Sequence, residues 1–214
     1  MTRARHRRHI VVFARNPIPG RVKTRLIPAM GLGPATALYR QMLEDTLVAC
    51  TQVIAHSRQL WIDQADPHPV MAEMAARFGM SIHAQRGVNL GSRMHAAFAE
   101  TLRNADSVVL IGSDCPEYDP PYLDAAFRAL EQYDAVLGPA ADGGYVLIGL
   151  TKPDPHLFLD VPWGTDKVLA ATRRQLHQLQ WSFMELPTKH DVDEPEDLLR
   201  FPHLARAAEI ECAK

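Results

Sequence analysis

A short cation-rich segment near the start of the chain could hold phosphate groups. Its cationic residues are Arg15, Arg21, Lys23 and Arg25. The residues Pro17, Pro19 and Gly20 disfavour a helix there and predict an irregular loop. Guanidinium and ammonium groups form charge-assisted hydrogen bonds with phosphate oxygens, so the segment predicts nucleotide binding. The alternative is a solvated basic surface loop, which composition alone favours.

Lys23 and Thr24 match the last two positions of the ATPase P-loop motif G-x-x-x-x-G-K-[ST]. That motif needs glycines that expose backbone amides to the phosphates. Here only Gly20 is present, three residues before the lysine. The sequence therefore excludes an ATPase P-loop.

A carboxylate at the end of an apolar run is the second candidate. Asp114 lies in the sequence Leu-Ile-Gly-Ser-Asp-Cys-Pro, just past a predicted buried strand. A carboxylate held there could bind Mg²⁺ or Mn²⁺, hard ions that prefer oxygen ligands and bridge phosphates. The alternative is a turn residue before Pro116. The neighbouring Cys115 has no base close to it in the sequence, which favours a small buried cysteine over a nucleophile.

An acidic segment near the end of the chain supplies a second carboxylate. Asp191 and Asp193 alternate, so in an extended strand their side chains share one side. Glu196 and Asp197 lie in the first turn of a predicted helix, where the helix dipole stabilises negative charge. Asp193 is either the N-cap of that helix or the second ligand of a metal at Asp114. Asp191 is the reserve candidate.

Three further segments could contact the rest of a substrate. Asp142-Gly143-Gly144 lies between two predicted strands. The glycines could let a substrate approach the backbone, with Asp142 bound to sugar hydroxyls or to an acceptor group. The alternative is a common hairpin turn. Segment 85–93 offers polar groups to a base or ribose, or is an ordinary loop. Its candidate residues are Gln85, Asn89 and Arg93. Trp163 either covers a substrate or packs as a loop aromatic.

Alternating strands and helices must position these residues. Strands are predicted at 10–14, 59–63, 80–84, 107–112, 134–139, 144–150 and 181–186. Helices are predicted at 33–50, 69–78, 90–102, 120–133, 165–179 and 195–200, with Pro202 starting another turn or helix. This order predicts an α/β fold with a mostly parallel sheet and helices on both faces. Loops 15–28, 85–91 and 112–117 should then lie on one rim, where ligands of such sheets bind.

The bulk composition is that of one globular domain. The chain has 214 residues, 47% of them hydrophobic and 22% charged, which predicts a single domain at 10–214. The basic residues before it predict a solvated tail at 1–9. A net charge of -2 gives no nucleic-acid signature, and no apolar run approaches a membrane span. The odd and widely spaced Cys50, Cys115 and Cys212 argue against a disulfide framework or zinc site, and favour a reducing cytoplasm.

Six motifs, in order along nearly the whole chain, resemble the GT-A glycosyltransferase and nucleotidyltransferase superfamily. The strongest resemblance is to the bacterial radical-SAM/selenodomain-associated transferase 1 family, which is arsenosugar-biosynthesis glycosyltransferase-like. The motifs are F-A-R-x-P-x-P-G-x-x-K-T-R-L at 13–26, G-x-N-L-G-x-R-M at 87–94, I-G-S-D-C-P at 111–116, G-P-A-x-D-G-G-Y at 138–145, V-P-W-G-T at 161–165 and D-V-D-x-P-E-D-L at 191–198.

The resemblance implies a single-domain GT-A fold and a metal-dependent transferase that acts on a nucleotide-activated substrate. The implied nucleotide-binding residues are Ala14, Arg15, Gly20, Arg21, Lys23, Arg25, Gln85, Asn89 and Arg93. Mg²⁺ or Mn²⁺ would be held by Asp114 and Asp193, and catalysis would rest on Lys23, Arg25 and Asp114. The implied substrate-binding residues are Asp142, Gly143, Gly144 and Trp163.

Two departures bear on the reaction. The chain lacks the Gly-Gly-x-Gly-Thr-Arg loop of sugar nucleotidyltransferases and is more similar to the guanylyltransferase that activates phospholactate for a deazaflavin cofactor. It also lacks a plain Asp-x-Asp after the strand at 107–112. Both departures favour nucleotidyl transfer from a nucleoside triphosphate with release of pyrophosphate.

The resembled family instead favours glycosyl transfer from a nucleoside diphosphate sugar to a small acceptor. A non-catalytic nucleotide-binding regulator is the third hypothesis. We expect small-molecule partners and neither nucleic acid nor membrane, and the sequence predicts no oligomeric state.

Overall fold

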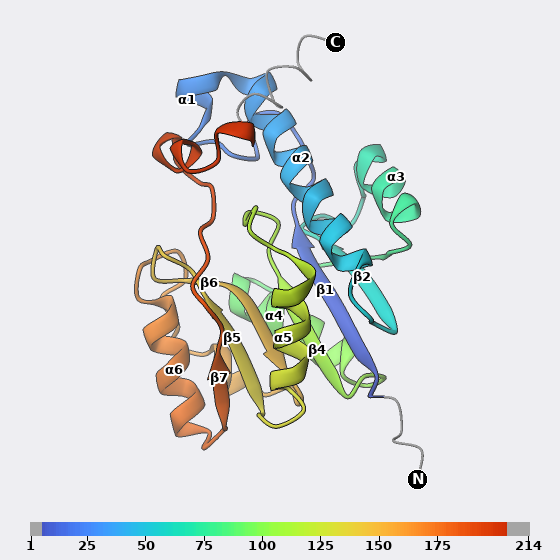
Figure 1. Ribbon diagram of the computed structural model, residues 1–214, viewed down its shortest axis with the longest axis vertical. Helices are drawn as coiled ribbons and strands as arrows, with labels where there is room; N and C mark the ends of the chain where they lie inside the picture. The colour runs from blue at the N-terminus through green and yellow to red at the C-terminus, as the bar shows by residue number, and fades with distance from the viewer. Residues whose placement is uncertain (1–5, 205–214) are drawn as a thin grey trace.

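The computed structural model of the chain describes residues 6–204 (Figure 1). One sheet contains seven strands in the order β3-β2-β1-β4-β6-β5-β7. The strands are β1 (Arg8–Ala14), β2 (Ser57–Ile62), β3 (Ser81–Ala84), β4 (Ser107–Ile111), β5 (Ala135–Pro139), β6 (Tyr145–Leu150) and β7 (Phe183–Glu185). Only β6 runs against its neighbours, so the predicted mostly parallel sheet is confirmed.

Helices connect the strands, as the alternating pattern predicts. The α-helices are α1 (Ile27–Met30), α2 (Leu32–Thr51), α3 (Pro69–Arg77), α4 (Leu90–Thr101), α5 (Pro120–Ala129) and α6 (Val168–Gln178). The two 3₁₀ helices are η1 (Pro155–Phe158) and η2 (Pro195–Leu199). Within residues 6–204, no helix combines the length and apolar character needed to cross a membrane.

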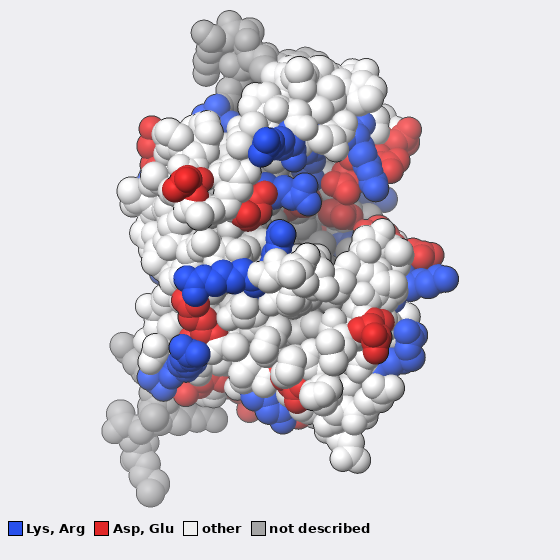
Figure 2. All heavy atoms as spheres, turned by 180° about the vertical axis from the view of Figure 1, so that it is seen from behind, with Lys and Arg blue, Asp and Glu red and all other residues white. Residues whose placement is uncertain are grey.

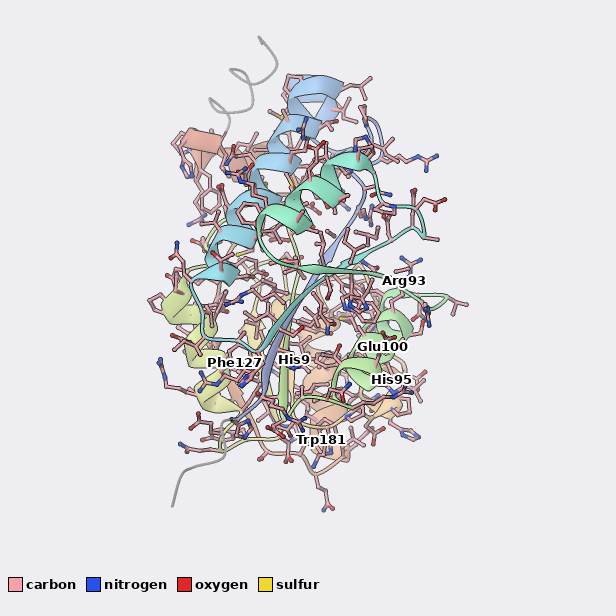
Figure 3. All side chains as sticks on the ribbon, turned by 90° about the vertical axis from the view of Figure 1, so that its right-hand side faces the viewer. His9, Arg93, His95, Glu100, Phe127 and Trp181 are labelled. Carbon is pink, nitrogen blue, oxygen red and sulfur yellow. The ribbon has the colours of Figure 1, made fainter. Side chains whose placement is uncertain are left out.

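The side chains of β1 alternate between two hydrophobic layers, because successive residues of a strand point to opposite faces. Ile10 and Val12 pack with α2, α3 and α5, whereas Val11 and Phe13 pack with α4 and α6. Figure 3 shows the two layers from the side, with Phe127 of α5 and His95 of α4 on opposite sides of the sheet. The expected three-layer α/β architecture is therefore present.

A smaller hydrophobic cluster joins distant parts of the chain at one end of the molecule. Leu26 and the first half of α2 pack there against Val192 and Phe201 from the C-terminal segment. In Figure 1, α1 and the red 3₁₀ segment near the C-terminus lie together beyond the edge of the sheet. This cluster holds the segment around residue 193 against the loop that follows β1.

The strand order reverses between β1 and β4. The chain runs outward from β1 through β2 to β3, and then returns to β4 on the other side of β1, with all four strands parallel. Ligands of open α/β sheets bind at such a reversal, beyond the carboxyl ends of the strands. The loops after β1, β3 and β4 leave the same edge of the sheet, as predicted.

Several boundaries differ from the predictions. β1 begins at Arg8 because Arg8 pairs with Ser107 and His9 with Ser57, so the end of the predicted tail belongs to the sheet. α1 and η1 were not predicted, since one turn of helix is too short to show periodicity. The last predicted helix is the 3₁₀ helix η2, and residues 202–204 are helical as expected from Pro202. The first five residues of the tail and Cys212 lie outside the described residues.

Gly149 tests how tightly the centre of the sheet is packed. A Cβ at this position would lie 2.6 Å from Val136 Cγ1 and 2.9 Å from Leu130 Cδ1. Gly149→Ala should therefore lower the free energy of unfolding by about 1–3 kcal/mol, measured by urea denaturation. Gly112→Ala is the control, because no atom lies within 4 Å of its added Cβ. Equal stability of the two variants would contradict this packing.

Candidate nucleotide-binding site

A cavity of about 700 Å³ opens at the carboxyl ends of β1 and β4. It is lined by residues after β1, β2, β3 and β4 and by Asp191 and Asp193 of the C-terminal segment. Figure 2 shows a hollow in the upper half of the molecule, bordered by both basic and acidic side chains. Its volume is in the range of small-molecule sites. The predicted nucleotide-binding residues that line it are Ala14, Arg15, Arg21, Lys23, Arg25, Gln85, Asn89 and Arg93.

Tyr39 of α2 clamps the end of β1 to the end of β4. Its buried hydroxyl accepts a hydrogen bond from Arg15 N at 2.7 Å and donates one to Arg15 O at 2.9 Å. The hydroxyl of Ser113, next to Asp114, donates to the Tyr39 hydroxyl oxygen at 3.3 Å. Burial raises the pKa of Tyr39, so the group stays a neutral phenol that can both donate and accept. One side chain thus sets the spacing between the cationic loop and the aspartate loop.

The backbone of Asn16 and the side chain of Gln85 fix the β2 side of the cavity. Asn16 N donates to Asp63 Oδ1 at 3.1 Å, which ties the loop after β1 to the end of β2. Gln85 Nε2 donates to Ala14 O at 3.2 Å and to Trp61 O at 2.9 Å. Gln85 therefore joins the carboxyl ends of β1 and β2. Its side-chain amide group donates both of its hydrogen bonds within the protein.

The ammonium group of Lys23 lies between the two predicted metal ligands. Lys23 Nζ forms an ion pair with Asp114 Oδ1, lies 3.4 Å from Asp193 Oδ1, and donates a hydrogen bond of 2.6 Å to Val192 O. Backbone contact reinforces the arrangement, because Val192 N donates to Asp114 O at 2.9 Å. Segments 169 residues apart in sequence therefore meet at one cation.

Burial by itself would lower the pKa of Lys23, but attraction by Asp114 and then by Asp193 outweighs burial and raises it. The lysine is therefore charged while almost fully buried. Its backbone has a φ of 46°, in the left-handed region that residues other than glycine rarely adopt. An unusual backbone conformation of this kind persists only where surrounding contacts hold it.

Asp193 does not cap the final helix. The N-cap of η2 is Glu194, and Asp197 accepts hydrogen bonds from the amides of Asp193 and Glu194. The Asp193 carboxylate instead faces Lys23, with Arg25 Nη1 at 3.7 Å from its second oxygen. The alternative interpretation of Asp193 as the N-cap is therefore wrong, because the residue next to it performs that role.

The arginines divide into free and paired groups. Arg15 and Arg21 are exposed on the cavity wall, and between residues 6 and 204 neither side chain has an ion pair. Arg25 pairs with Glu194 at 3.2 Å, and Arg93 Nε donates to Gly87 O at 3.2 Å. Arg93 lies in the first turn of α4, and in Figure 3 it is well separated from Trp181, which lies in the lower part of the view. Arg15 and Arg21 are thus the cations most available to an anionic ligand.

Asn89 has a structural role in addition to its place on the cavity wall. Its side chain caps α4 by accepting a hydrogen bond of 2.8 Å from Ser92 N, and the Ser92 hydroxyl accepts one from Asn89 N. This capping box accounts for Asn89 and Ser92 without a ligand. Both interpretations of this loop are therefore compatible with its geometry.

The predicted substrate-binding turn does not line the cavity. Asp142 Oδ1 accepts a hydrogen bond of 2.8 Å from Gly144 N, within the turn that joins β5 to β6. A Cβ on Gly143 would overlap Asp166 O, so this glycine is needed for packing against the segment before α6. The turn behaves as the hairpin of the alternative interpretation.

Trp163 and Gly20 also lie outside the cavity lining. The indole of Trp163 packs against Gly91 at the start of α4 and contacts the ring of Tyr145 edge-on, with centroids 6.4 Å apart. Trp163 therefore packs against the start of α4. Gly20 turns the loop after β1, with a φ of 80°.

Several cavity residues were missed by the sequence analysis. Tyr39 was not singled out, because its role depends on contacts to Arg15 and Ser113 that the sequence does not show. Asp63 could have been recognised by the same signal as Asp114, a carboxylate at the end of a buried strand. Cys115 is 2% exposed and burial raises its pKa to about 12, which agrees with the prediction of a buried, unreactive thiol.

Asp114 and Asp193 fit a divalent cation that arrives with a phosphate ligand. Across residues 6–204, no group of three or more His, Cys, Asp or Glu side chains is arranged to hold a metal. Both carboxylates nevertheless contact the same ammonium nitrogen, so their oxygens face one point. Mg²⁺ is commonly bound by one or two carboxylates, waters and substrate phosphates. The donor set is sufficient for that mode of binding.

Solved structures with the same fold define its class. A protein from Desulfovibrio desulfuricans G20, proposed to be a nucleotide-diphospho-sugar transferase, is 29% identical, with a TM-score of 0.82 over 95% of this chain and 98% of that chain. CMP:2-keto-3-deoxy-manno-octonic acid synthetase, solved with CTP, is 11% identical, with a TM-score of 0.61 over 94% of this chain and 98% of that one.

Glucosyl-3-phosphoglycerate synthase from Mycobacterium tuberculosis is also 11% identical, with a TM-score of 0.58 over 97% of this chain and 80% of that one. That structure contains Mn²⁺, UDP and glucosyl-3-phosphoglycerate. These three neighbours are transferases or proposed transferases, which supports the expectation of an enzyme.

The fold is therefore that of the nucleotide-diphospho-sugar transferases, and the predicted GT-A class is confirmed. The chain itself belongs to the bacterial family described as "Uncharacterized protein conserved in bacteria (DUF2064)", which matches residues 46–165. No curated protein sequence matches the chain.

Tyr39→Phe tests the clamp between β1 and β4. The variant keeps the buried ring but leaves Arg15 N and O without their partner, which should cost about 1–3 kcal/mol of unfolding free energy. The amide of Arg15 should also exchange its hydrogen faster, as measured by mass spectrometry. Tyr133→Phe, at a partly exposed tyrosine beyond α5, is the matched control. Unchanged exchange at Arg15 would show that the hydroxyl is not a clamp.

Asp191 gives a prediction about pH. Burial, followed by repulsion from Asp142 and Asp193, raises the pKa of Asp191 from 3.8 to about 6. The folded protein therefore holds a proton on Asp191 more tightly than the unfolded chain does. The protonated Asp191 contributes its full stabilisation of the fold below pH 3.8, and this contribution is lost as the pH rises through about 6. In the absence of divalent ions, Asp191→Asn should match the wild-type Tm in acid and exceed it above about pH 6.

Asp134→Asn is the control of opposite sign, because a hydrogen bond from Lys152 lowers the pKa of Asp134. That contribution is present above 3.8 and is lost as the pH falls through the lowered value. Asp134→Asn should therefore be less stable than the wild type at neutral pH. A constant Tm difference between Asp191→Asn and wild type at all pH values would refute the prediction for Asp191.

Proposed function

We propose that this chain is a metal-dependent transferase that acts on a nucleotide, most specifically by transfer of a nucleotidyl group from a nucleoside triphosphate. The observation that carries the proposal is the cavity at the reversal between β1 and β4. There the cationic loop faces the carboxylates of Asp114 and Asp193, which both contact the ammonium group of Lys23. Positive side chains for phosphates beside carboxylates for a metal are the parts that phosphoryl-group chemistry requires.

In this proposal the phosphates lie along the loop after β1. Arg15 and Arg21 supply guanidinium groups that are exposed and carry no ion pair within residues 6–204, while Arg25 reaches the same wall from the next turn. The base lies toward β2 and β3, where Asp63, Gln85 and Asn89 offer polar atoms. Asp63 has a second carboxylate oxygen that could accept a hydrogen bond from a base N–H group.

Asp114 and Asp193 would hold Mg²⁺ or Mn²⁺, which when bound supplies positive charge to the phosphate oxygens. An oxyanion of the acceptor attacks the α-phosphorus in line with the bridging oxygen to the β-phosphate. The new P–O bond forms as the bridging bond breaks, and pyrophosphate leaves with the electron pair. Arg15, Arg21 and Arg25 neutralise the charge of that leaving group. The reaction needs no protein nucleophile, which agrees with the burial of Cys115.

Glycosyl transfer is the second candidate, and the relative from Desulfovibrio desulfuricans favours it. That protein, proposed to be a nucleotide-diphospho-sugar transferase, matches over nearly the full length of both chains. The same cavity would then hold a nucleoside diphosphate sugar, with the diphosphate as leaving group. The acceptor hydroxyl would approach from the side of Asp191, which lines the cavity and lies near Asp142.

We further propose the finer assignments that the motifs imply. The presence of six motifs in order along the chain supports a place beside the radical-SAM/selenodomain-associated transferases. The continuous hydrophobic layers support one catalytic domain over residues 10–214. Buried free thiols at Cys50 and Cys115 are compatible with the expected reducing cytoplasm. A non-catalytic regulator would bind nucleotides without turnover.

The products released by the purified protein distinguish these functions. Each common nucleoside triphosphate and nucleoside diphosphate sugar is incubated with Mg²⁺ or Mn²⁺ and a panel of small phosphate-bearing and hydroxyl-bearing acceptors. Pyrophosphate release supports nucleotidyl transfer, and nucleoside diphosphate release supports glycosyl transfer. Tight binding with neither product would support the regulator and overturn the proposal.

Asp114→Asn tests the chemistry at the site. The variant keeps the side-chain shape but removes a negative charge that a hard divalent ion prefers, so we expect turnover to fall by at least about a hundredfold. Nucleotide binding should lose the part that depends on Mg²⁺, as measured by calorimetry with and without the ion. Asp124→Asn, at a half-exposed aspartate of α5 that lies near Arg8 and does not line the cavity, is the matched control and should retain full activity. Full turnover by Asp114→Asn would refute the assignment of Asp114 as a ligand of the divalent ion.

A further inference from the structure

The point between Asp114 and Asp193 is filled by a side chain of the protein itself. The Lys23 side chain is 2% exposed, whereas those of Asp114 and Asp193 are 49% and 53% exposed. Lys23 Nζ is thus the only buried member of the cluster and lies on the protein side of both carboxylates. A divalent ion held by both carboxylates would need the space or the oxygens that the ammonium group uses.

The ammonium group has no donor left for a nucleotide. Its three N–H bonds match three oxygens, on Asp114, Asp193 and Val192. In this conformation Lys23 therefore cannot also bind the phosphates for which its place in the cationic loop suits it. The two roles suggested by the sequence, phosphate ligand and neighbour of the metal, exclude one another in a single conformation.

We propose that Lys23 is a built-in occupant of the divalent-cation site, which leaves the carboxylates when the ion binds and then pairs with the incoming phosphates. The inference rests on the proposed function, in which Asp114 and Asp193 hold a divalent cation. The exchange keeps charge balanced, because the ion replaces the ammonium between the carboxylates while the ammonium moves to an anionic ligand. Binding of the ion and of the nucleotide is then cooperative, and each strengthens the other equally.

The local backbone is suited to such a change. Lys23 has a φ of 46° and lies in an irregular loop between Gly20 and α1, so its conformation depends on the contacts of its side chain. Both carboxylates are half exposed to the cavity, which gives an ion a path to their outer oxygens. A divalent ion alone must displace an ammonium with three partners, so it should bind weakly without nucleotide.

The first test measures Mn²⁺ binding to the nucleotide-free protein by electron paramagnetic resonance of the free ion. Lys23→Met keeps the length of the buried stem and removes the competing charge. It should bind Mn²⁺ at least about tenfold more tightly than the wild type, as expected for loss of a charge-assisted contact. Lys152→Met, which removes a lysine paired with Asp134, is the matched control and should leave Mn²⁺ affinity unchanged.

Adding Asp114→Asn to Lys23→Met should abolish the gain, which assigns the ion to these carboxylates. Equal or weaker Mn²⁺ binding by folded Lys23→Met would overturn the exchange, even if Mn²⁺-dependent turnover of the wild type upheld the proposed function. Conversely, a clear gain in affinity without turnover on any nucleotide would uphold the exchange and refute the proposed function.

A second measurement uses the wild-type protein and does not depend on how the variant folds. Acylation of each lysine by an amine-reactive reagent is followed by mass spectrometry, first without additions and then with saturating Mn²⁺. Displacement by the ion should increase the labelling of Lys23, because its ammonium group leaves its buried partners, while that of Lys152 stays constant. Adding a nucleoside triphosphate should then protect Lys23 again. Unchanged Lys23 labelling with saturating Mn²⁺ would overturn the proposal.

Discussion

The charge of the buried Lys23 ammonium is the constraint on which the geometry of the site depends. Removing a cation from water is costly unless opposite charges and hydrogen-bond acceptors surround it. Lys23 finds these partners on the loop after β4 and on the C-terminal segment, which reaches the site only because Val192 and Phe201 pack against α2. The ion cluster and the small hydrophobic cluster therefore support each other, and together they bring Asp193 to the cavity.

The sheet explains why these groups meet where they do. Parallel pairing of β1 with β2 and β4 directs every following loop to one edge, and the reversal of strand order leaves a crevice between them. Tyr39 then sets the distance across that crevice through three hydrogen bonds. A rigid frame of this kind suits chemistry that depends on positioning and charge neutralisation.

The fold is shared by enzymes that transfer nucleotidyl groups and by enzymes that transfer sugars, so the scaffold does not select the reaction. In the proposed function a leaving phosphate chain must be neutralised in either reaction, and the cationic loop after β1 would supply the positive charge. What distinguishes the two reactions is the group presented to the acceptor on the side of Asp191. That side is acidic, with Asp191, Asp142 and Asp193 close enough to influence one another.

The sequence by itself determined the α/β alternation, the parallel sheet and the candidate residues at the ends of strands, because apolar periodicity and turn residues are local signals. It also placed Lys23, Arg25 and Asp114 on loops of one rim, and it offered Asp193 either as an N-cap or as the second ligand of a metal at Asp114. Only the tertiary structure decided that Lys23 lies between the two aspartates, that Glu194 and not Asp193 caps η2, and that Trp163 and the turn at Asp142 pack as scaffold. The position of Lys23 depends on a contact between segments 169 residues apart, that of Lys23 with Val192. No local pattern encodes the distance between such segments, since packing of the whole chain sets it.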